Sequence, residues 1–187
     1  GTVNMSGGTL SAGAAPRIGG AGTGTLDQSG GLTTWTGWMG VGRLNAGSGT
    51  YRLHGTGQAS GDNLIIGEDA GSVGLVRLYE TPTLTLAARL EVGRNGTGRL
   101  HVIGDGATIN VGQYVQGANG TLELDINGIS PINVTGPVSL AGALDVEFLI
   151  PPSAHQWIPI ILNDGSDSVT GIFAGLPEGT HFMVPGF

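Results

Sequence analysis

The sequence predicts an all-β protein, a parallel β-helix with three short strands in each coil of about 24 residues and an atypical β cap at its C-terminal end. Three observations support this prediction. A glycine-headed phrase recurs along the chain, apolar residues alternate within each copy, and no segment has the periodicity of a helix. Self-similarity at a period of this length is typical of a solenoid, in which each copy forms one coil.

The repeated phrase begins with a glycine that precedes an alternating apolar pair, as in GRLHV at residues 98–102. Copies start 22 to 25 residues apart, at Gly1, Gly24, Gly49, Gly74, Gly98 and Gly120. Each coil closes on an apolar residue followed by glycine, such as Val41-Gly42. A leucine-rich repeat has a similar length, but its leucine and asparagine scaffold and its helical return segment are missing here. The coils are therefore predicted to consist of strands.

The first strand of each coil follows the initial glycine, where apolar residues stand two apart with polar residues between them. This alternation is typical of a half-buried strand. Stacking the coils predicts an inward ladder made of Leu26, Tyr51, Val76, Leu100 and Leu122.

Two further apolar segments complete each coil. The second is represented by Leu32, by Leu84 and by Val138, and the third by Met39 and Val41 in the coil that contains Leu32. The longest glycine-free runs are interrupted by Pro82 and by Pro151-Pro152, and their apolar residues alternate, so both are predicted to be strands with turns.

Residues 1–120 are predicted to form regular coils, and residues 121–187 the final coils and a capping segment of the same domain. The first residues already match the interior of a repeat. Val3 and Met5 are therefore expected to form an uncovered apolar rung, with Phe182 and Phe187 as the corresponding edge residues at the other end. Either like subunits stacked end to end or neighbouring coils of a longer parent chain would cover these edges, and the sequence leaves both open.

The composition limits the classes of molecule that the protein is expected to bind. The net charge is −7, which disfavours nucleic acid and anionic membranes, and no stretch is long and apolar enough to span a bilayer. Cysteine is absent, so neither disulfides nor thiolate metal sites are available. No cofactor is predicted: the histidines are scattered singly, and the loop NDGSDS lacks the spacing of a calcium loop, which leaves calcium as a minor alternative.

The polar residues between the ladder residues predict an outward column in which Arg52, Arg77 and His101 form a basic strip with acids at its ends. Such a strip suits an acidic glycan, because Arg binds carboxylates through charge-assisted hydrogen bonds. The alternative is a solvated face on which each Arg pairs with a neighbouring acid.

Trp35 and Trp38 lie between the second and third strands of one coil and are expected to be exposed. An exposed aromatic pair suits stacking on sugar rings or contact with a neighbouring protein. The alternative is a hydrophobic corner packed under its own loop.

Enzymatic activity is not predicted. A glycosidase or polysaccharide lyase needs paired carboxylates, or an acidic calcium cluster beside a base, in a groove. Asp62, Glu68 and Asp69 come closest, but they occupy turn positions in which acidic residues are common.

The repeated phrase IGGAGTGTLDQSGG resembles the autotransporter-associated β-strand repeats of large bacterial surface and secreted proteins, and INVTGPVSLAGALDVEF with WIPIIL and SVTGIFAGLPEGTHF is similar to the segment that closes such regions. The resemblance implies a right-handed parallel β-helix at the cell surface or outside the cell. It favours a structural module, a rod, stalk or filament subunit with an adhesive role. The alternative is a carbohydrate-binding or polysaccharide-degrading β-helix, because this fold hosts adhesins, fibres and enzymes alike.

Overall fold

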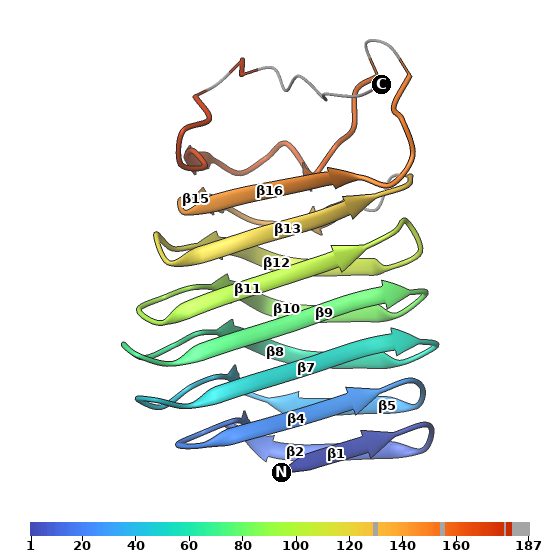
Figure 1. Ribbon diagram of the computed structural model, residues 1–187, viewed down its shortest axis with the longest axis vertical. Helices are drawn as coiled ribbons and strands as arrows, with labels where there is room; N and C mark the ends of the chain where they lie inside the picture. The colour runs from blue at the N-terminus through green and yellow to red at the C-terminus, as the bar shows by residue number, and fades with distance from the viewer. Residues whose placement is uncertain (129–130, 154–155, 178, 181–187) are drawn as a thin grey trace.

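Parallel strands stack along one axis in about six turns of about 24 residues each in the computed structural model of the chain. The structure describes residues 1–128, 131–153, 156–177 and 179–180. Strands in the front layer of Figure 1 run from left to right as the chain rises from its N-terminus, which makes the coil right-handed. The predicted parallel β-helix is therefore confirmed.

The first sheet contains one strand from each coil, and every neighbouring pair is parallel. Its strands are, in spatial order, β1 (Thr2–Met5), β4 (Thr23–Gln28), β7 (Ser48–Gly55), β9 (Val73–Glu80), β11 (Thr97–Ile103), β13 (Gly120–Ile126) and β16 (Ala143–Phe148).

The second sheet supplies the other two sides of the coil. Its main path runs through β2 (Thr9–Ala14), β5 (Leu32–Thr36), β8 (Gln58–Ile66), β10 (Thr83–Val92), β12 (Thr108–Gln116), β14 (Ile132–Val134) and β17 (Ile161–Asn163), and short strands beside it are β3 (Arg17–Ile18), β6 (Trp38–Val41), β15 (Val138–Leu140) and β18 (Val169–Gly171). In the middle coils the second and third predicted strands are one continuous strand with a register shift, between Leu86 and Arg89 in β10. The shift bends the strand, as an extra unpaired residue does in a bulge.

The predicted ladder is present in the first sheet. Its members are buried and are partners in register from coil to coil, in the order Leu26, Tyr51, Val76, Leu100 and Leu122. Each ladder residue is packed from above and below by its neighbours at the ordinary strand spacing of about 4.8 Å. A coil therefore buries its apolar side chains mainly against adjacent coils.

Two buried tyrosines have hydroxyl groups satisfied by glutamine inside the coil. Tyr51 donates to Gln28 Oε1 at 2.6 Å, and Tyr114 donates to Gln116 Oε1 at 2.7 Å. The amide of Gln28 donates in turn to two backbone carbonyls, those of Gly31 and Gln58. Burial raises the pKa of both tyrosine hydroxyls, because a phenolate would be poorly solvated there.

The second segment of the coil differs from the prediction in two places. Leu32 is the register partner of Gln58 and points outward, whereas Thr33 and Trp35 are buried. Val138 pairs with Tyr114 and belongs to the third segment, and Ile132 takes its place in the second.

The capping region is only partly stranded. Of the apolar segment at residues 157–162, only Ile161 and Leu162 lie in β17, and Trp157 is 90% exposed. The edge residues Phe182 and Phe187 lie outside the described residues. Within the described part of the chain, no helix is long and apolar enough to cross a membrane.

Candidate functional site

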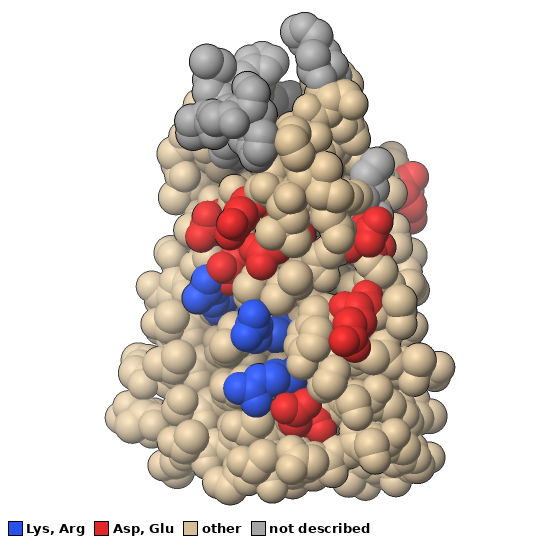
Figure 2. Space-filling view, turned by 45° about the vertical axis from the view of Figure 1, so that its right-hand side comes forward, with Lys and Arg blue, Asp and Glu red and all other residues tan. Residues whose placement is uncertain are grey.

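The outward side of the first sheet carries most of the charged side chains that face one another across coils, and we call it the charged face. Its register matches the predicted column in every coil, with partners in the order Asn4, Asp27, Arg52, Arg77, His101 and Glu123. Figure 2 shows basic side chains in a vertical strip over the middle coils, with acidic side chains below, above and beside them.

Arg52 lies at the lower part of the strip and has an acidic neighbour. Its Nη1 is 3.5 Å from Asp27 Oδ2, and its side chain is 40% exposed. Asp27 also binds His54 Nε2 through its other oxygen, at 2.8 Å. An exposed pair of this length contributes only about 0 to 1 kcal/mol, so Arg52 can exchange Asp27 for a ligand at little cost.

The surroundings of Arg77 differ from those of Arg52. It lies between Arg52 and His101 in register, and the described residues provide no carboxylate partner for it. Its Nε is buried and has no hydrogen-bond acceptor within the described chain. A buried donor without an acceptor costs about 1 to 3 kcal/mol, so an anion placed here would find a guanidinium that gains by binding it.

An aromatic pair stands beside the two arginines. The rings of His54 and Tyr79 are stacked with centroids 4.5 Å apart. Burial raises the pKa of the Tyr79 hydroxyl, and the nearby carboxylates of Asp27 and Glu80 raise it further. A hollow of about 280 Å³ opens next to His54 and is lined by Asn4, Met5, Ser6, Asp27 and Ser29 as well.

The two tryptophans lie on the second sheet, away from the charged face. Trp35 is buried at 4% exposure, so its expected exposure is wrong. Its indole fills the space above Gly61, where a side chain would overlap the ring, and its Nε1 donates to Asn63 O at 2.9 Å. Trp35 therefore belongs to the hydrophobic core and packs against the neighbouring coil, not in a corner under its own loop.

Trp38 is half-buried and is covered by arginines. The guanidinium carbons of Arg89 and Arg94 lie 5.9 and 5.1 Å from its ring centroid. Arg94 is itself fixed by Glu91, to which its Nε donates at 2.8 Å. A ring already faced by two cations is a poor platform for stacking on sugars.

Two of the three acids considered for catalysis have structural partners. Asp62 accepts a hydrogen bond from Gly37 N at 2.7 Å, and Glu68 forms an ion pair with Arg43 at 2.5 Å. These contacts tie neighbouring coils together at the bend of the second sheet and at the closing corner.

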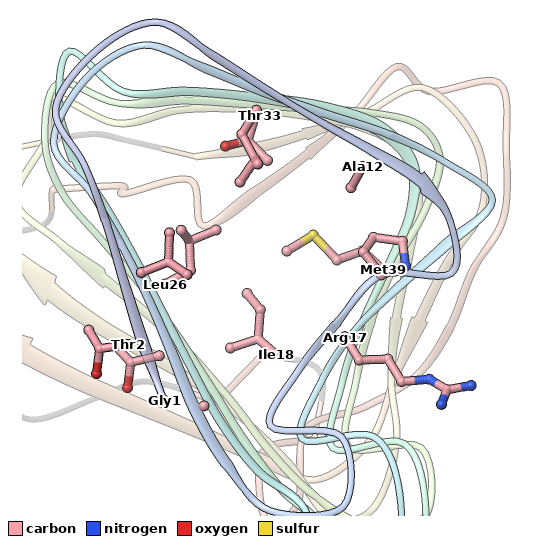
Figure 3. A pocket seen from close by; sticks show the side chains of 13 residues that line it. Gly1, Thr2, Ala12, Arg17, Ile18, Leu26, Thr33 and Met39 are labelled. Carbon is pink, nitrogen blue, oxygen red and sulfur yellow. The ribbon is translucent and has the colours of Figure 1, made fainter.

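The end of the first coil is a second surface of interest. A cavity of about 400 Å³ opens there, lined mainly by apolar side chains that include Val3, Leu10, Ile18, Leu26 and Met39. Figure 3 looks along the coil and shows Ile18, Leu26 and Met39 pointing into its triangular interior, whereas Arg17 points out. Val3 is 53% exposed at this end of the stack. Met5, the other predicted edge residue, is half-buried.

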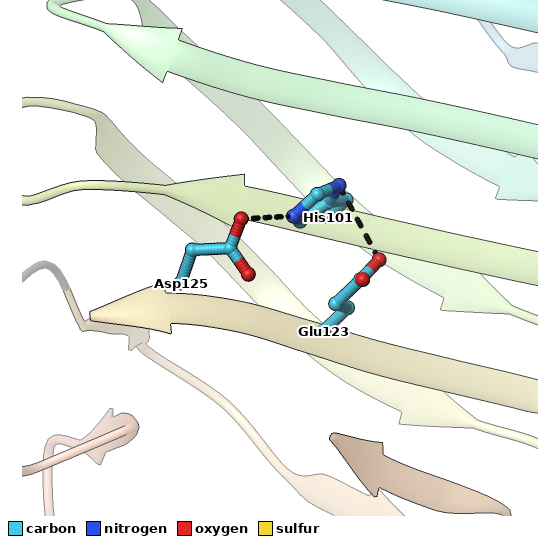
Figure 4. Close-up of side chains that lie close together, drawn as sticks. All are labelled: His101, Glu123 and Asp125. Atoms are coloured by element: carbon cyan, nitrogen blue, oxygen red, sulfur yellow. Dashed lines mark hydrogen bonds and ion pairs between the residues drawn. The ribbon is translucent and has the colours of Figure 1, made fainter. Parts of the chain in front are cut away.

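The upper part of the charged face contains a cluster that the sequence analysis did not recognise. His101 Nε2 is 2.9 Å from Asp125 Oδ2, and His101 Nδ1 is 3.3 Å from Glu123 Oε2 (Figure 4). One ligand atom from each residue lies within 4.8 Å of the others, a separation compatible with a shared metal ion. Glu123 also pairs with Arg99 through its other oxygen.

This cluster escaped recognition because His101 is more than 20 residues from Glu123 and Asp125 in sequence, whereas metal motifs are usually sought at short spacing. The signal that could have found it was the coil register itself. The outward column already placed Glu123 next to His101, and Asp125 is two residues further along the same strand.

Comparison with protein-family models, with curated proteins and with solved structures found no match to this chain.

Proposed function

We propose that this chain is a structural module of an extracellular or bacterial cell-surface β-solenoid, part of a rod, stalk or filament with an adhesive role. The observation that supports this proposal is the uninterrupted stacking of similar coils along one axis, joined by parallel ladders in both sheets. Such a stack gives length and stiffness, and it offers long side faces for contact. The cellular location rests on the resemblance of the repeat to surface and secreted proteins.

The cavity at the first coil supports end-to-end assembly. The apolar rung around Val3, Leu26 and Met39 has the shape and chemistry of an interior rung, and β1 and β2 offer unpaired backbone groups beside it. A further coil would bury the rung and pair both strands. In a larger assembly that coil comes from a like subunit or from the same parent chain. In a solution of the chain of residues 1–187, another copy can supply that coil.

Sedimentation velocity over a range of concentrations tests this proposal, with electron microscopy of the concentrated sample. We expect the wild-type chain to associate into linear strings and Val3→Arg to remain monomeric. Val73→Arg is the matched control, because Val73 is 49% exposed, close to the 53% of Val3, but lies on the side of the stack. A wild-type chain that stays monomeric throughout, or a Val3→Arg variant that associates like the wild type, would contradict end-to-end assembly.

A second candidate function is binding of an acidic glycan on the charged face. The observation that favours it is Arg77, whose guanidinium has no carboxylate partner among the described residues and stands beside Arg52 and the stacked Tyr79 ring. Two guanidinium groups on neighbouring coils are spaced to bind successive carboxylates or sulfates, and the ring offers a face to a sugar.

A panel of uronic-acid and sulfated oligosaccharides at low salt tests this function, because weak screening favours charge contacts. We expect Arg77→Gln to weaken binding about tenfold or more, since a hydrogen bond to a charged group contributes about 1.5 to 3 kcal/mol. Arg17→Gln, which removes an exposed arginine of the second sheet, should leave binding unchanged. Equal loss in both variants would indicate a general charge effect and would remove the site.

A further inference from the structure

His101 is the most enclosed ionisable group of the charged face. It stands in the middle of β11 with its side chain only 10% exposed, and the coil above places Glu123 and Asp125 at its two ring nitrogens. Glu123 Oε2 is fully buried and accepts no hydrogen bond within the described chain. The space between His101 and Glu123 therefore contains polar atoms whose partners the protein does not supply.

A neutral His101 ring has too few hydrogens to donate to both carboxylates. A neutral imidazole has a single N–H, and the shorter contact, 2.9 Å to Asp125 Oδ2, assigns that hydrogen to Nε2. The lone pair of Nδ1 then faces the carboxylate oxygen Glu123 Oε2 across 3.3 Å. Two acceptors that face each other in a place with little water repel unless a cation lies between them.

The separation of these two acceptors fits a transition-metal ion. Zn²⁺ binds imidazole nitrogen and carboxylate oxygen at about 2.0 to 2.2 Å in tetrahedral geometry, which places two ligand atoms about 3.3 to 3.5 Å apart. The observed 3.3 Å lies in this range. Ca²⁺ fits poorly, because it prefers six to eight oxygen ligands and seldom accepts imidazole.

We propose that His101 and Glu123 bind one divalent transition-metal ion such as Zn²⁺, with His101 Nδ1 and Glu123 Oε2 as ligands and Asp125 as the residue that holds the histidine ring. Hydrogen bonding of the second ring nitrogen to a carboxylate is the usual way in which a protein fixes a metal-binding histidine. Arg99 engages the other oxygen of Glu123 and so leaves Oε2 directed at His101.

The surroundings favour a positive ion at this point. Asp145 is the register partner of Glu123, and Glu147 is the register partner of Asp125, so four carboxylates occupy two adjacent coils of the face. Water would complete the coordination sphere. Against these acids stand Arg99, and Arg77 in the coil below His101.

His54 gives an internal comparison on the same face. Its Nε2 binds Asp27 Oδ1 at 2.8 Å, and its Nδ1 is 3.6 Å from Glu80 Oε2. That oxygen already accepts a hydrogen bond from Gly55 N, and the Glu80 side chain is 60% exposed. His54 therefore lacks a buried acceptor without a partner, and the proposal does not extend to it.

Isothermal titration of the chelator-treated chain with ZnCl₂ near neutral pH tests the site. We expect one saturable site in the wild type, with His101→Asn and Glu123→Gln binding at least about tenfold more weakly, the lower limit found when even a supporting residue is removed. His54→Asn is the matched control and should bind as the wild type does. CaCl₂ in excess should not displace the zinc.

A second measurement covers the case in which a variant does not fold. Nitrogen NMR of the wild-type histidine rings, with and without ZnCl₂, should show the His101 Nδ1 resonance shifting on saturation while that of His54 stays in place. Lack of saturable zinc binding by the wild type overturns the proposal and leaves a proton as the ion between His101 and Glu123. Unchanged affinity in a folded His101→Asn variant, or equal weakening in His54→Asn, overturns it too.

Discussion

Truncation of a middle rung of the ladder tests how the coil is stabilised. Leu100 is completely buried between Val76 in the coil below and Leu122 in the coil above. Leu100→Ala removes three carbon atoms from this position, which at about 0.8 kcal/mol for each buried carbon corresponds to about 2.4 kcal/mol of lost transfer free energy. A cavity remains as well, and it raises the cost.

The cavity is expected to stay open. Hydrogen bonds from β11 to β9 and to β13 fix the distance between coils on both sides of Leu100, so Val76 and Leu122 cannot move together. We therefore expect a total loss of about 3 to 4 kcal/mol, within the range of about 2 to 5 kcal/mol observed for leucine truncation in protein cores. For a chain of this length, each kcal/mol lowers Tm by about 2 to 4 °C, so Tm should fall by about 6 to 16 °C.

Differential scanning calorimetry and urea unfolding of wild type and variant measure this loss. Val3→Ala is the control from the same ladder, because Val3 is 53% exposed at the uncovered end and should cost less than about 1 kcal/mol. If Leu100→Ala were as mild as Val3→Ala, the ladder would not be the source of stability and the assigned register would be wrong.

Two further predictions concern the buried tyrosines. Tyr114→Phe should destabilise the protein by about 1 to 3 kcal/mol, because it leaves Gln116 Oε1 without its donor. Tyr51→Phe should cost only about 0.5 to 1.5 kcal/mol, because Thr33 still donates to Gln28 Oε1 at 2.8 Å. Equal losses of stability in urea unfolding would contradict this difference. The raised pKa of the Tyr51 and Tyr114 hydroxyls means that the folded state retains their protons more tightly than the unfolded state, so the stability they contribute is full below pH about 10 and is lost as the pH rises further. Absorbance at 295 nm should show these two tyrosines ionising only as circular dichroism reports unfolding, while Tyr79 ionises in the folded chain. Ionisation of all three with the folded signal intact would contradict the burial of Tyr51 and Tyr114.

The coil and much of its register could be predicted from the sequence, because the signal is repeated. Alternation assigns each ladder residue an inward or outward side, and the glycine that heads each copy aligns one coil with the next. A parallel stack that aligns these glycines leaves no freedom beyond that, so the inward ladder from Leu26 to Leu122 and the outward column from Asn4 to Glu123 follow from the aligned copies.

For the second strand, the sequence did not predict which side chains point into the coil. Leu32 and Trp35 are three residues apart, so a strand of alternating sides cannot turn both inward. Hydropathy ranks Leu32 first, but Gly61 in the coil above leaves room for an indole ring, and that space fixes Trp35 inside with Thr33. The space over a glycine of the adjacent coil therefore determines which side chain points inward, and the local hydropathy pattern contains no information about that space.

The sequence by itself thus determined the repeat, the parallel stack of strands and the order of charges along the outward column. Only the tertiary structure decided which charges meet. The structure pairs Arg52 with Asp27, provides no carboxylate for Arg77 among the residues it describes, and places both ring nitrogens of His101 against acids of the coil above. The physical reason is that register fixes the backbone positions of side chains, whereas contacts between long side chains depend on rotamers and on neighbours to either side, which the order of residues does not specify.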